Sequence, residues 1–152
     1  GSYTKIESCT KLGSNTKLGG YTKLLKTPNI FTECNILFTT GVLMQNKKGV
    51  FFKCVKENLT DFYSGKYQYK IGKGDKMKMK RDQNIDCGEG THWASFWGAI
   101  KNLGARKGKI ISAEIELKDV MSVSYAYQKV RFRAYKNVQL VKIKELGLIG
   151  KR

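Results

Sequence analysis

The chain's single histidine lies in a short segment that also holds a cysteine, two glycines and a tryptophan. This segment reads Asp86-Cys87-Gly88-Glu89-Gly90-Thr91-His92-Trp93. A thiol and an imidazole can act as nucleophile and base when the fold brings them together. The two glycines predict a tight turn that delivers His92 onto a strand. Cys87 and His92 are therefore the first candidates for catalytic residues.

A structural interpretation of the same residues competes with the catalytic one. A lone histidine beside a tryptophan often fixes a turn, with a hydrogen bond through one ring nitrogen. A cysteine in such a turn can instead pack or bond locally, and Asp82 and Asp86 could orient the His92 ring. The sequence leaves the catalytic and the structural role of His92 both open.

Positive charge dominates the composition. Lysine and arginine number 29 against 12 aspartates and glutamates, so the formal net charge is +17. This imbalance predicts attraction to nucleic acid or another polyanion, although a basic surface can also serve solubility alone. The candidate anion-binding or nucleic-acid-binding residues form three groups along the chain: Lys73, Lys76, Lys78, Lys80 and Arg81; Arg106 and Lys107; Arg131 and Arg133.

Several tyrosines lie between these basic groups. They could stack on bases, or they could pack at the rim of a small core. The residues in question are Tyr63, Tyr67, Tyr69, Tyr125 and Tyr127.

Cysteine spacing and hydropathy bear on the cellular location of the protein. Cys9, Cys34, Cys54 and Cys87 lack any metal-binding spacing, so we predict free thiols, no metal and no cofactor. We see no secretory signal and no segment long and apolar enough to span a membrane. We therefore expect an intracellular location, which for a viral protein means the host cytoplasm or the virion.

An aliphatic residue recurs at every sixth position through the first 36 residues. The positions are Ile6, Leu12, Leu18, Leu24, Ile30 and Ile36. No α-helix keeps this period, whereas a left-handed hexapeptide β-helix does, because three hexapeptides close one coil. Residues 1–36 resemble that fold and predict about two coils.

Two coils bury too little surface to be stable alone. We therefore expect the repeat to self-associate, for instance as a trimer, to continue upstream of Gly1, or to pack on the following domain. Hexapeptide acyltransferases need a catalytic histidine, and the segment from Gly1 to Ile36 has none. The repeat is thus interpreted as a scaffold.

Residues 37–152 predict a small α+β domain with antiparallel strands and one main helix. With the repeat in front, the predicted fold class is mainly β with some α. The helix is expected over residues 93–103, ended by Gly104. A short helix is expected over residues 59–63, after Asn58 as its cap. The expected strands cover residues 36–45, 50–55, 67–71, 109–117, 130–135 and 138–143, with a lysine-protected edge strand in 72–81.

The order of motifs over residues 50–143 resembles a small domain of unknown function. That domain follows repeat segments in giant-virus, protist and phage proteins. The likeness is carried by Cys87-x-x-Gly90-x-His92-Trp93, by Tyr67–Gly72, by Leu117-Lys118-Asp119-Val120 and by Lys129–Tyr135. The resemblance implies architecture rather than chemistry. With the repeat, it implies a non-enzymatic structural or adaptor protein, viral in origin, whose β-helical stalk presents a basic interaction domain.

A second resemblance points to a different class. Gly88–Ser95 is similar to the Gly-x-Gly-x-Tyr-Phe-Ala segment that lines the nicotinamide pocket of poly-ADP-ribose-polymerase-like transferases. This resemblance implies NAD as the bound cofactor and a site around His92. The upstream His-Gly pair of that family is absent, and Phe51–Cys54 stands in its place. The catalytic glutamate has no clear counterpart, and Glu114 and Glu116 are candidates only by proximity. A nucleic-acid-binding module and an ADP-ribosyltransferase-like enzyme, active or degenerate, therefore remain as alternatives.

Overall fold

The computed structural model describes residues 30–78 and 89–142. Most of the predicted hexapeptide repeat, as well as the candidates Lys80, Arg81 and Cys87, lies outside the described residues. The β-helix over residues 1–29 therefore stays a prediction.

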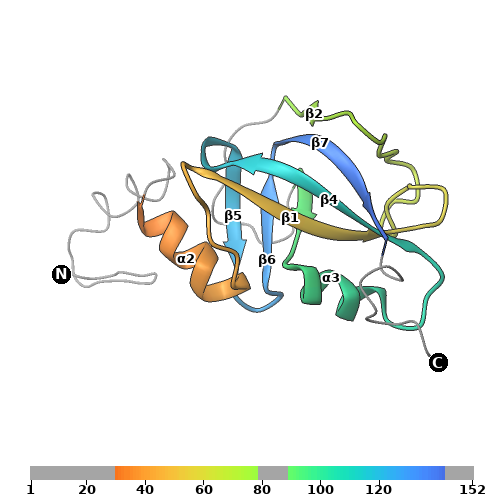
Figure 1. Ribbon diagram of the computed structural model, residues 1–152, viewed down its shortest axis with the longest axis horizontal. Helices are drawn as coiled ribbons and strands as arrows, with labels where there is room; N and C mark the ends of the chain where they lie inside the picture. The colour runs from red at the N-terminus through yellow and green to blue at the C-terminus, as the bar shows by residue number, and fades with distance from the viewer. Residues whose placement is uncertain (1–29, 79–88, 143–152) are drawn as a thin grey trace.

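The described part of the chain is mainly β, with antiparallel pairing throughout (Figure 1). Its strands are β1 (Lys48–Val55), β2 (Asp75–Lys76), β3 (Thr91–Trp93), β4 (Lys109–Glu116), β5 (Val120–Ser124), β6 (Lys129–Phe132) and β7 (Ala134–Val141). The four-stranded sheet has the order β1-β4-β7-β2, and the three-stranded sheet has the order β3-β6-β5. This confirms the expected β-rich α+β class.

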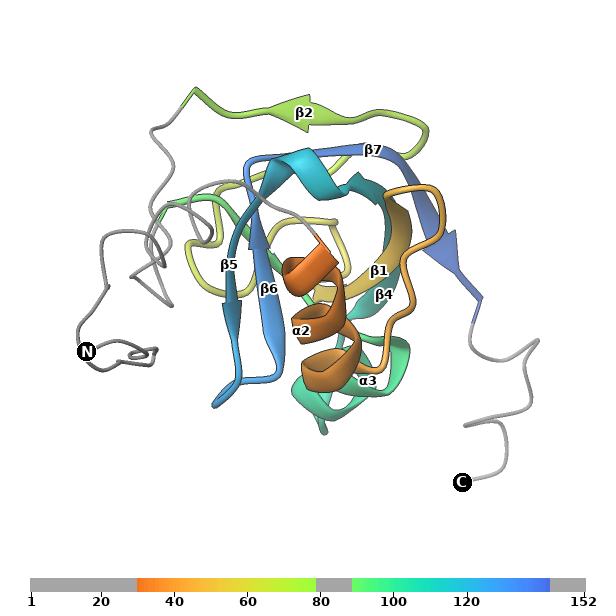
Figure 2. The same ribbon diagram turned by 90° about the vertical axis from the view of Figure 1, so that its left-hand side faces the viewer.

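Within the described residues, two helices and one 3-10 turn accompany the sheets. Helix α2 (Ile30–Thr40) packs against β5 and β6, and Figure 2 shows it beside these two strands. Helix α3 (Phe96–Leu103) packs against β1. The 3-10 turn η1 (Leu117–Asp119) connects β4 to β5. Of the described helices, none has the length and apolar character needed to cross a membrane.

The core forms where the two sheets meet. The Phe51 ring of β1 lies edge-on to the Phe132 ring of β6, with centroids 5.0 Å apart, and both side chains are fully buried. Adjacent residues Ile110 and Ile111 of β4 point to opposite faces and are both fully buried, so both faces of this strand are covered. The strand predicted over residues 109–117 is confirmed as β4, and its burial makes it an interior strand.

The backbone of β1 is also joined directly to the residue after β3. The Phe52 amide donates to the Ala94 carbonyl, and the Ala94 amide donates to the Phe52 carbonyl, both at 2.8 Å. This pair of hydrogen bonds links the two sheets and fixes β3 alongside the middle of β1.

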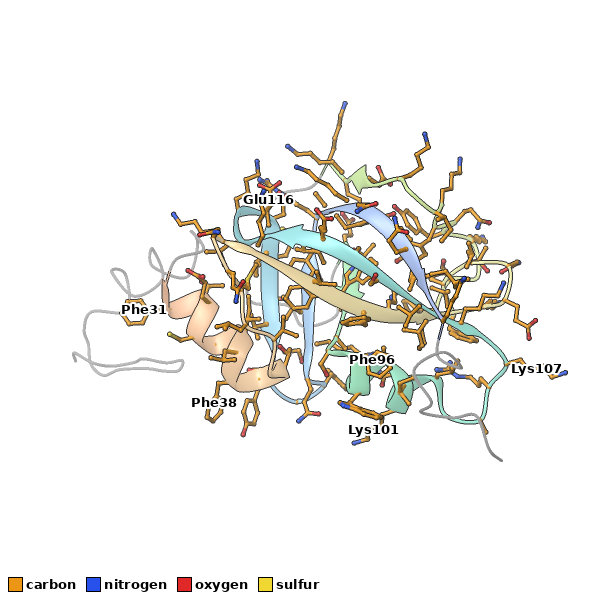
Figure 3. The ribbon with its side chains drawn as sticks, in the orientation of Figure 1. Phe31, Phe38, Phe96, Lys101, Lys107 and Glu116 are labelled. Atoms are coloured by element: carbon orange, nitrogen blue, oxygen red, sulfur yellow. The ribbon has the colours of Figure 1, made fainter. Side chains whose placement is uncertain are left out.

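The predicted strand over residues 36–45 is wrong, and so is the last part of the predicted repeat. Residues 30–40 form helix α2 instead. Ile36 and Thr39 are one helical turn apart and are both buried, so one helix face packs on β5 and β6. Phe31 and Phe38 point away from the sheets (Figure 3). Gly41, with φ +76°, ends the helix by donating to the Leu37 carbonyl at 2.8 Å.

The predicted short helix at residues 59–63 is also wrong. The Asn58 side-chain oxygen accepts hydrogen bonds from the Thr60 amide at 3.1 Å and from the Thr60 hydroxyl at 2.7 Å. Leu59 has φ +68°, which a right-handed helix cannot accommodate. A local Asx-type turn therefore replaces the helix.

The predicted strand at residues 67–71 is reduced to one isolated bridge between Gln68 and Thr60. The edge strand within residues 72–81 is present as the short β2. Helix α3 is confirmed, with Ser95 as its N-cap and Gly104 at its C-terminal end. Strand β5 lies outside the strands expected from the sequence.

Replacing Phe51 by alanine should lower the free energy of unfolding by about 3–5 kcal/mol, because the cavity would open between the two sheets. Phe38 provides a matched control, since its ring is 77% exposed. Phe38→Ala should lower the free energy of unfolding by less than about 1 kcal/mol. Urea denaturation of both variants tests this, and equal losses would contradict the assigned core.

Candidate functional site

Strand β3 places the only histidine of the chain. It pairs with β6 so that His92 lies opposite Arg131. Thr91 and Trp93 are buried on one face, while His92 faces the other side and is partly exposed. The Trp93 indole donates to the Thr91 hydroxyl at 2.8 Å, which fixes the strand from below.

The turn before β3 depends on Gly90. This residue has φ +116°, and a Cβ atom there would lie 2.7 Å from the Phe132 carbonyl oxygen. A side chain therefore fits neither the conformation nor the space. The prediction that a glycine turn delivers His92 onto a strand is confirmed.

His92 lines two cavities that also share Lys53, Tyr63 and Lys129. The larger has a volume of about 830 Å³ and the smaller about 390 Å³. Their walls come from β1, β3, β5, β6, α3 and the segment between residues 61 and 69. The larger cavity is lined by Lys53, Asp61, Tyr63, Ser64, Tyr67, Tyr69, Met77, Glu89, Gly90, Thr91, His92, Ser124, Tyr127 and Lys129.

Lys53 is the most unusual group of this site. It lies on β1, and its amine donates to the His92 carbonyl oxygen at 3.0 Å. The amine also lies 6.0 Å from the centroid of the Tyr69 ring. Burial lowers the pKa of Lys53 from 10.5 to about 8; Cys54 opposes this shift and the charge of Lys129 adds to it. A lysine of this kind can be neutral near physiological pH.

The tyrosines of the larger cavity differ strongly in exposure. Tyr69 is buried and lies edge-on to Trp93, with ring centroids 5.7 Å apart. The Tyr67 hydroxyl hydrogen-bonds to Asp75 and to the Tyr135 hydroxyl. Burial and then the hydrogen bond to Asp75 raise the pKa of Tyr67, so this hydroxyl stays neutral.

Two further tyrosines stand at the rim of the larger cavity. Tyr63 is fully exposed and Tyr127 is 60% exposed. Their rings are open to solvent, so they are accessible to a planar ligand.

Asp61 is already engaged by its own turn. Its carboxylate accepts hydrogen bonds from the Ser64 hydroxyl at 2.5 Å and from the Gly65 amide at 3.0 Å. Partial burial raises the pKa of Asp61, but these hydrogen bonds outweigh it and lower the pKa overall. The acidic group therefore stabilises the cavity wall.

The glutamate candidates, Glu114 and Glu116, are not brought to His92. Glu114 lies on β4, where its carboxylate accepts a hydrogen bond from the Asn137 side chain at 2.9 Å. It lines a separate cavity of about 280 Å³ with Glu116 and Asp119. Cys87 lies outside the described residues, so no Cys87–His92 pair can be evaluated.

The structure separates the basic candidates into different roles. Arg131 is 2% exposed and donates to the Ser122 hydroxyl at 3.1 Å and to the Glu89 carbonyl at 2.6 Å. Arg131, a candidate for anion binding, is instead a buried guanidinium that serves the fold. Arg133 forms an ion pair with Asp119 at 3.1 Å.

Arg106 is the basic candidate that reaches the site. Its guanidinium lies 4.0 Å from the centroid of the Phe62 ring, and it lines the smaller cavity. Lys107 points outward from the far end of the domain (Figure 3). Lys73, Lys76 and Lys78 are exposed and lie outside the two cavities at His92.

Sequence reasoning missed Lys53 and Lys129 as site residues. Lys53 interrupts the apolar run Val50–Val55, and a charged residue in the middle of such a strand is a signal that could have been used. Lys129 carries no comparable signal, because it begins a strand after a turn.

The described residues offer little to a metal ion. In residues 30–78 and 89–142, no group of three or more histidine, cysteine, aspartate or glutamate side chains could hold one. Cys34 and Cys54 are free thiols, and Cys34 is exposed. The cavities at His92 suit an organic ligand better, since volumes of this size are common for small-molecule sites.

The low pKa of Lys53 should appear in the pH dependence of stability. Between pH 8 and about 10.4 the unfolded chain holds a proton on Lys53 that the native protein has lost, so stability rises with pH. From pH 7 to pH 9.5 the free energy of unfolding should rise by about 1–2 kcal/mol more in the wild type than in Lys53→Met. Urea denaturation at both pH values measures this, and identical pH dependence in the two proteins would contradict it.

Comparison of the chain with models of protein families, with curated proteins and with solved structures finds no significant match. The two resemblances drawn from the motifs around His92 therefore stay predictions. Function has to be argued from the cavities themselves.

Proposed function

We propose that the domain is a basic interaction module that binds single-stranded nucleic acid at the cavities around His92. The observation that carries this proposal is the larger cavity, in which exposed tyrosine rings and lysine side chains line one space. Aromatic rings bind unpaired bases by stacking, and cations bind the phosphates that connect them. The cavity combines both kinds of group.

The arrangement of these groups supports an unpaired ligand. Tyr63 and Tyr127 are open to solvent at the rim, whereas Lys53 and Lys129 line both cavities. A base enters such a cavity only when it is not held in a duplex. Single strands should therefore bind more tightly than duplexes of the same sequence.

Charge supports the same ligand at long range. A net charge of +17 attracts a polyanion before any contact forms. Arg106 extends the positive charge into the smaller cavity. Two acidic residues, Asp61 and Glu89, also line the larger cavity, and the Asp61 carboxylate is occupied by hydrogen bonds from Ser64 and Gly65.

This proposal includes the expected role of a structural or adaptor protein. In that role the repeat segment associates with itself and presents the basic domain to nucleic acid. The transferase alternative is not carried forward, because no described feature favours it. His92 and Glu114 line separate cavities.

Tyr63→Ala and Tyr127→Ala should each weaken binding of a fluorescent single-stranded oligonucleotide by about 5-fold to 100-fold, the usual value of one stacked base. Tyr125→Ala provides a matched control, because Tyr125 is 69% exposed but stacks on Phe38 away from the cavity. Fluorescence anisotropy measures the three affinities. Equal losses in all three variants would contradict binding at the cavity.

The affinity should also fall steeply with salt, and Lys129→Gln should reduce the salt slope by about one ion. Lys101→Gln removes the same charge from the exposed side of α3, outside both cavities (Figure 3). Its salt slope should stay close to that of the wild type. Absence of binding at low salt would refute the proposed function.

A further inference from the structure

The amine of Lys53 lies in a cavity wall and is held by a backbone carbonyl, whereas a lysine that only binds anions needs no such position. It lies between the two cavities and lines both of them. Its hydrogen-bond acceptor is a neutral backbone carbonyl, that of His92, at 3.0 Å. Within residues 30–78 and 89–142, no carboxylate forms an ion pair with it.

This environment favours the neutral amine. Burial disfavours the charged form of Lys53 most, and the positive charge of Lys129 adds to this effect, whereas Cys54 and Asp61 oppose it. At pH 7.5 a lysine with a pKa of about 8 is neutral in about a quarter of the molecules. An ordinary surface lysine is neutral in about one molecule in a thousand. Lys53 therefore presents far more neutral amine than a surface lysine does.

We propose that Lys53 is the nucleophile of an imine-forming site for an aldehyde carried on a phosphate-bearing molecule. The nitrogen lone pair of Lys53 forms a bond to the carbonyl carbon, and the carbonyl π electrons move to oxygen. The two amine protons then leave with that oxygen as water, and a carbon–nitrogen double bond remains. The step needs no oxidant or reductant.

The phosphate of such a ligand has its own binding groups. Lys129 lines both cavities with Lys53, and Arg106 lines the smaller one. These two cations can hold the phosphate while the aldehyde faces the Lys53 nitrogen. In this arrangement Lys129 and Arg106 bind the phosphate, and Lys53 reacts with the aldehyde.

Two sources supply this chemistry. One is single-stranded DNA with an abasic site, whose ring-opened sugar is an aldehyde between two phosphates; this source rests on the proposed function. The other is a small phosphorylated aldehyde, for which pyridoxal 5′-phosphate is the probe. The experiment below treats the two sources separately.

The test uses the full chain with each probe and sodium cyanoborohydride, which reduces an imine to a stable amine. Peptide mapping by mass spectrometry should find the adduct on Lys53. Lys53→Arg keeps the charge but cannot form the imine, so the adduct yield should fall at least about tenfold. Lys101→Arg, on the exposed side of α3, should leave the yield unchanged. The yield in the wild type should rise between pH 7 and pH 8.5 and then level off.

An adduct on Lys53 with abasic DNA supports the proposal with a nucleic acid as ligand. An adduct on Lys53 with pyridoxal phosphate alone supports it with a small phosphorylated aldehyde. Labelling spread over surface lysines with Lys53 unmodified would overturn it, and so would an equal yield in Lys53→Arg. If that variant does not fold, the mapped position in the wild type decides.

Binding of an undamaged oligonucleotide is measured in parallel. If it binds but Lys53 forms no adduct, the imine site fails and the proposed function stands. If it does not bind but pyridoxal phosphate labels Lys53, the proposed function fails and the imine site stands.

Discussion

Two backbone hydrogen bonds between Phe52 and Ala94, each 2.8 Å long, hold the site together. They join the four-stranded sheet to the segment that follows β3, and they do so one residue from Lys53 and two residues from His92. The position of the Lys53 amine beside the His92 carbonyl follows from this joint. The aromatic contact between Phe51 and Phe132 lies next to it in the core and keeps the two sheets at a fixed spacing. Any change that opens the joint would therefore disturb the fold and the cavity together.

The pair of hydrogen bonds between Phe52 and Ala94 also changes how the role of His92 is interpreted. The contact with Lys53 comes from the backbone of His92, so the position of β3 matters to this contact as much as the imidazole does. Two contacts hold strand β3 in place. The Trp93 indole donates a hydrogen bond to the Thr91 hydroxyl, and Gly90, which has no side chain, permits the close approach of the Phe132 carbonyl. The structural and functional interpretations of the Gly90–Trp93 segment thus apply to different residues. Thr91 and Trp93 are buried and hold the strand in place, while His92 is partly exposed and its carbonyl accepts the Lys53 hydrogen bond.

What the sequence revealed depended on how local the signal was. The strand at residues 109–117 and the helix ended by Gly104 were predictable, because a local apolar pattern and a glycine determine them. Helix α2 was not, since Ile30 and Ile36 fit the six-residue period and only packing on β5 and β6 explains the burial of Ile36. His92 attracted notice because it is unique. Lys53 did not, because its amine is unusual only after Tyr69, His92 and Lys129 surround it. Arg131 is the opposite case: the sequence made it a candidate for anion binding at the surface, but its side chain is buried in the fold.

The two proposed uses of the site impose opposite demands on Lys53. An ammonium binds a phosphate, but a phosphate close to Lys53 would raise its pKa and remove the neutral amine that reacts with an aldehyde. Both uses are compatible only when the phosphate is bound elsewhere in the same cavity. Lys129 and Arg106 offer such a place, because they line the cavities while the Lys53 amine donates to the His92 carbonyl. The positive charge of Lys129 also lowers the pKa of Lys53. A phosphate at Lys129 would partly cancel this effect, so binding of the anion and reactivity of the amine are coupled through one pair of lysines.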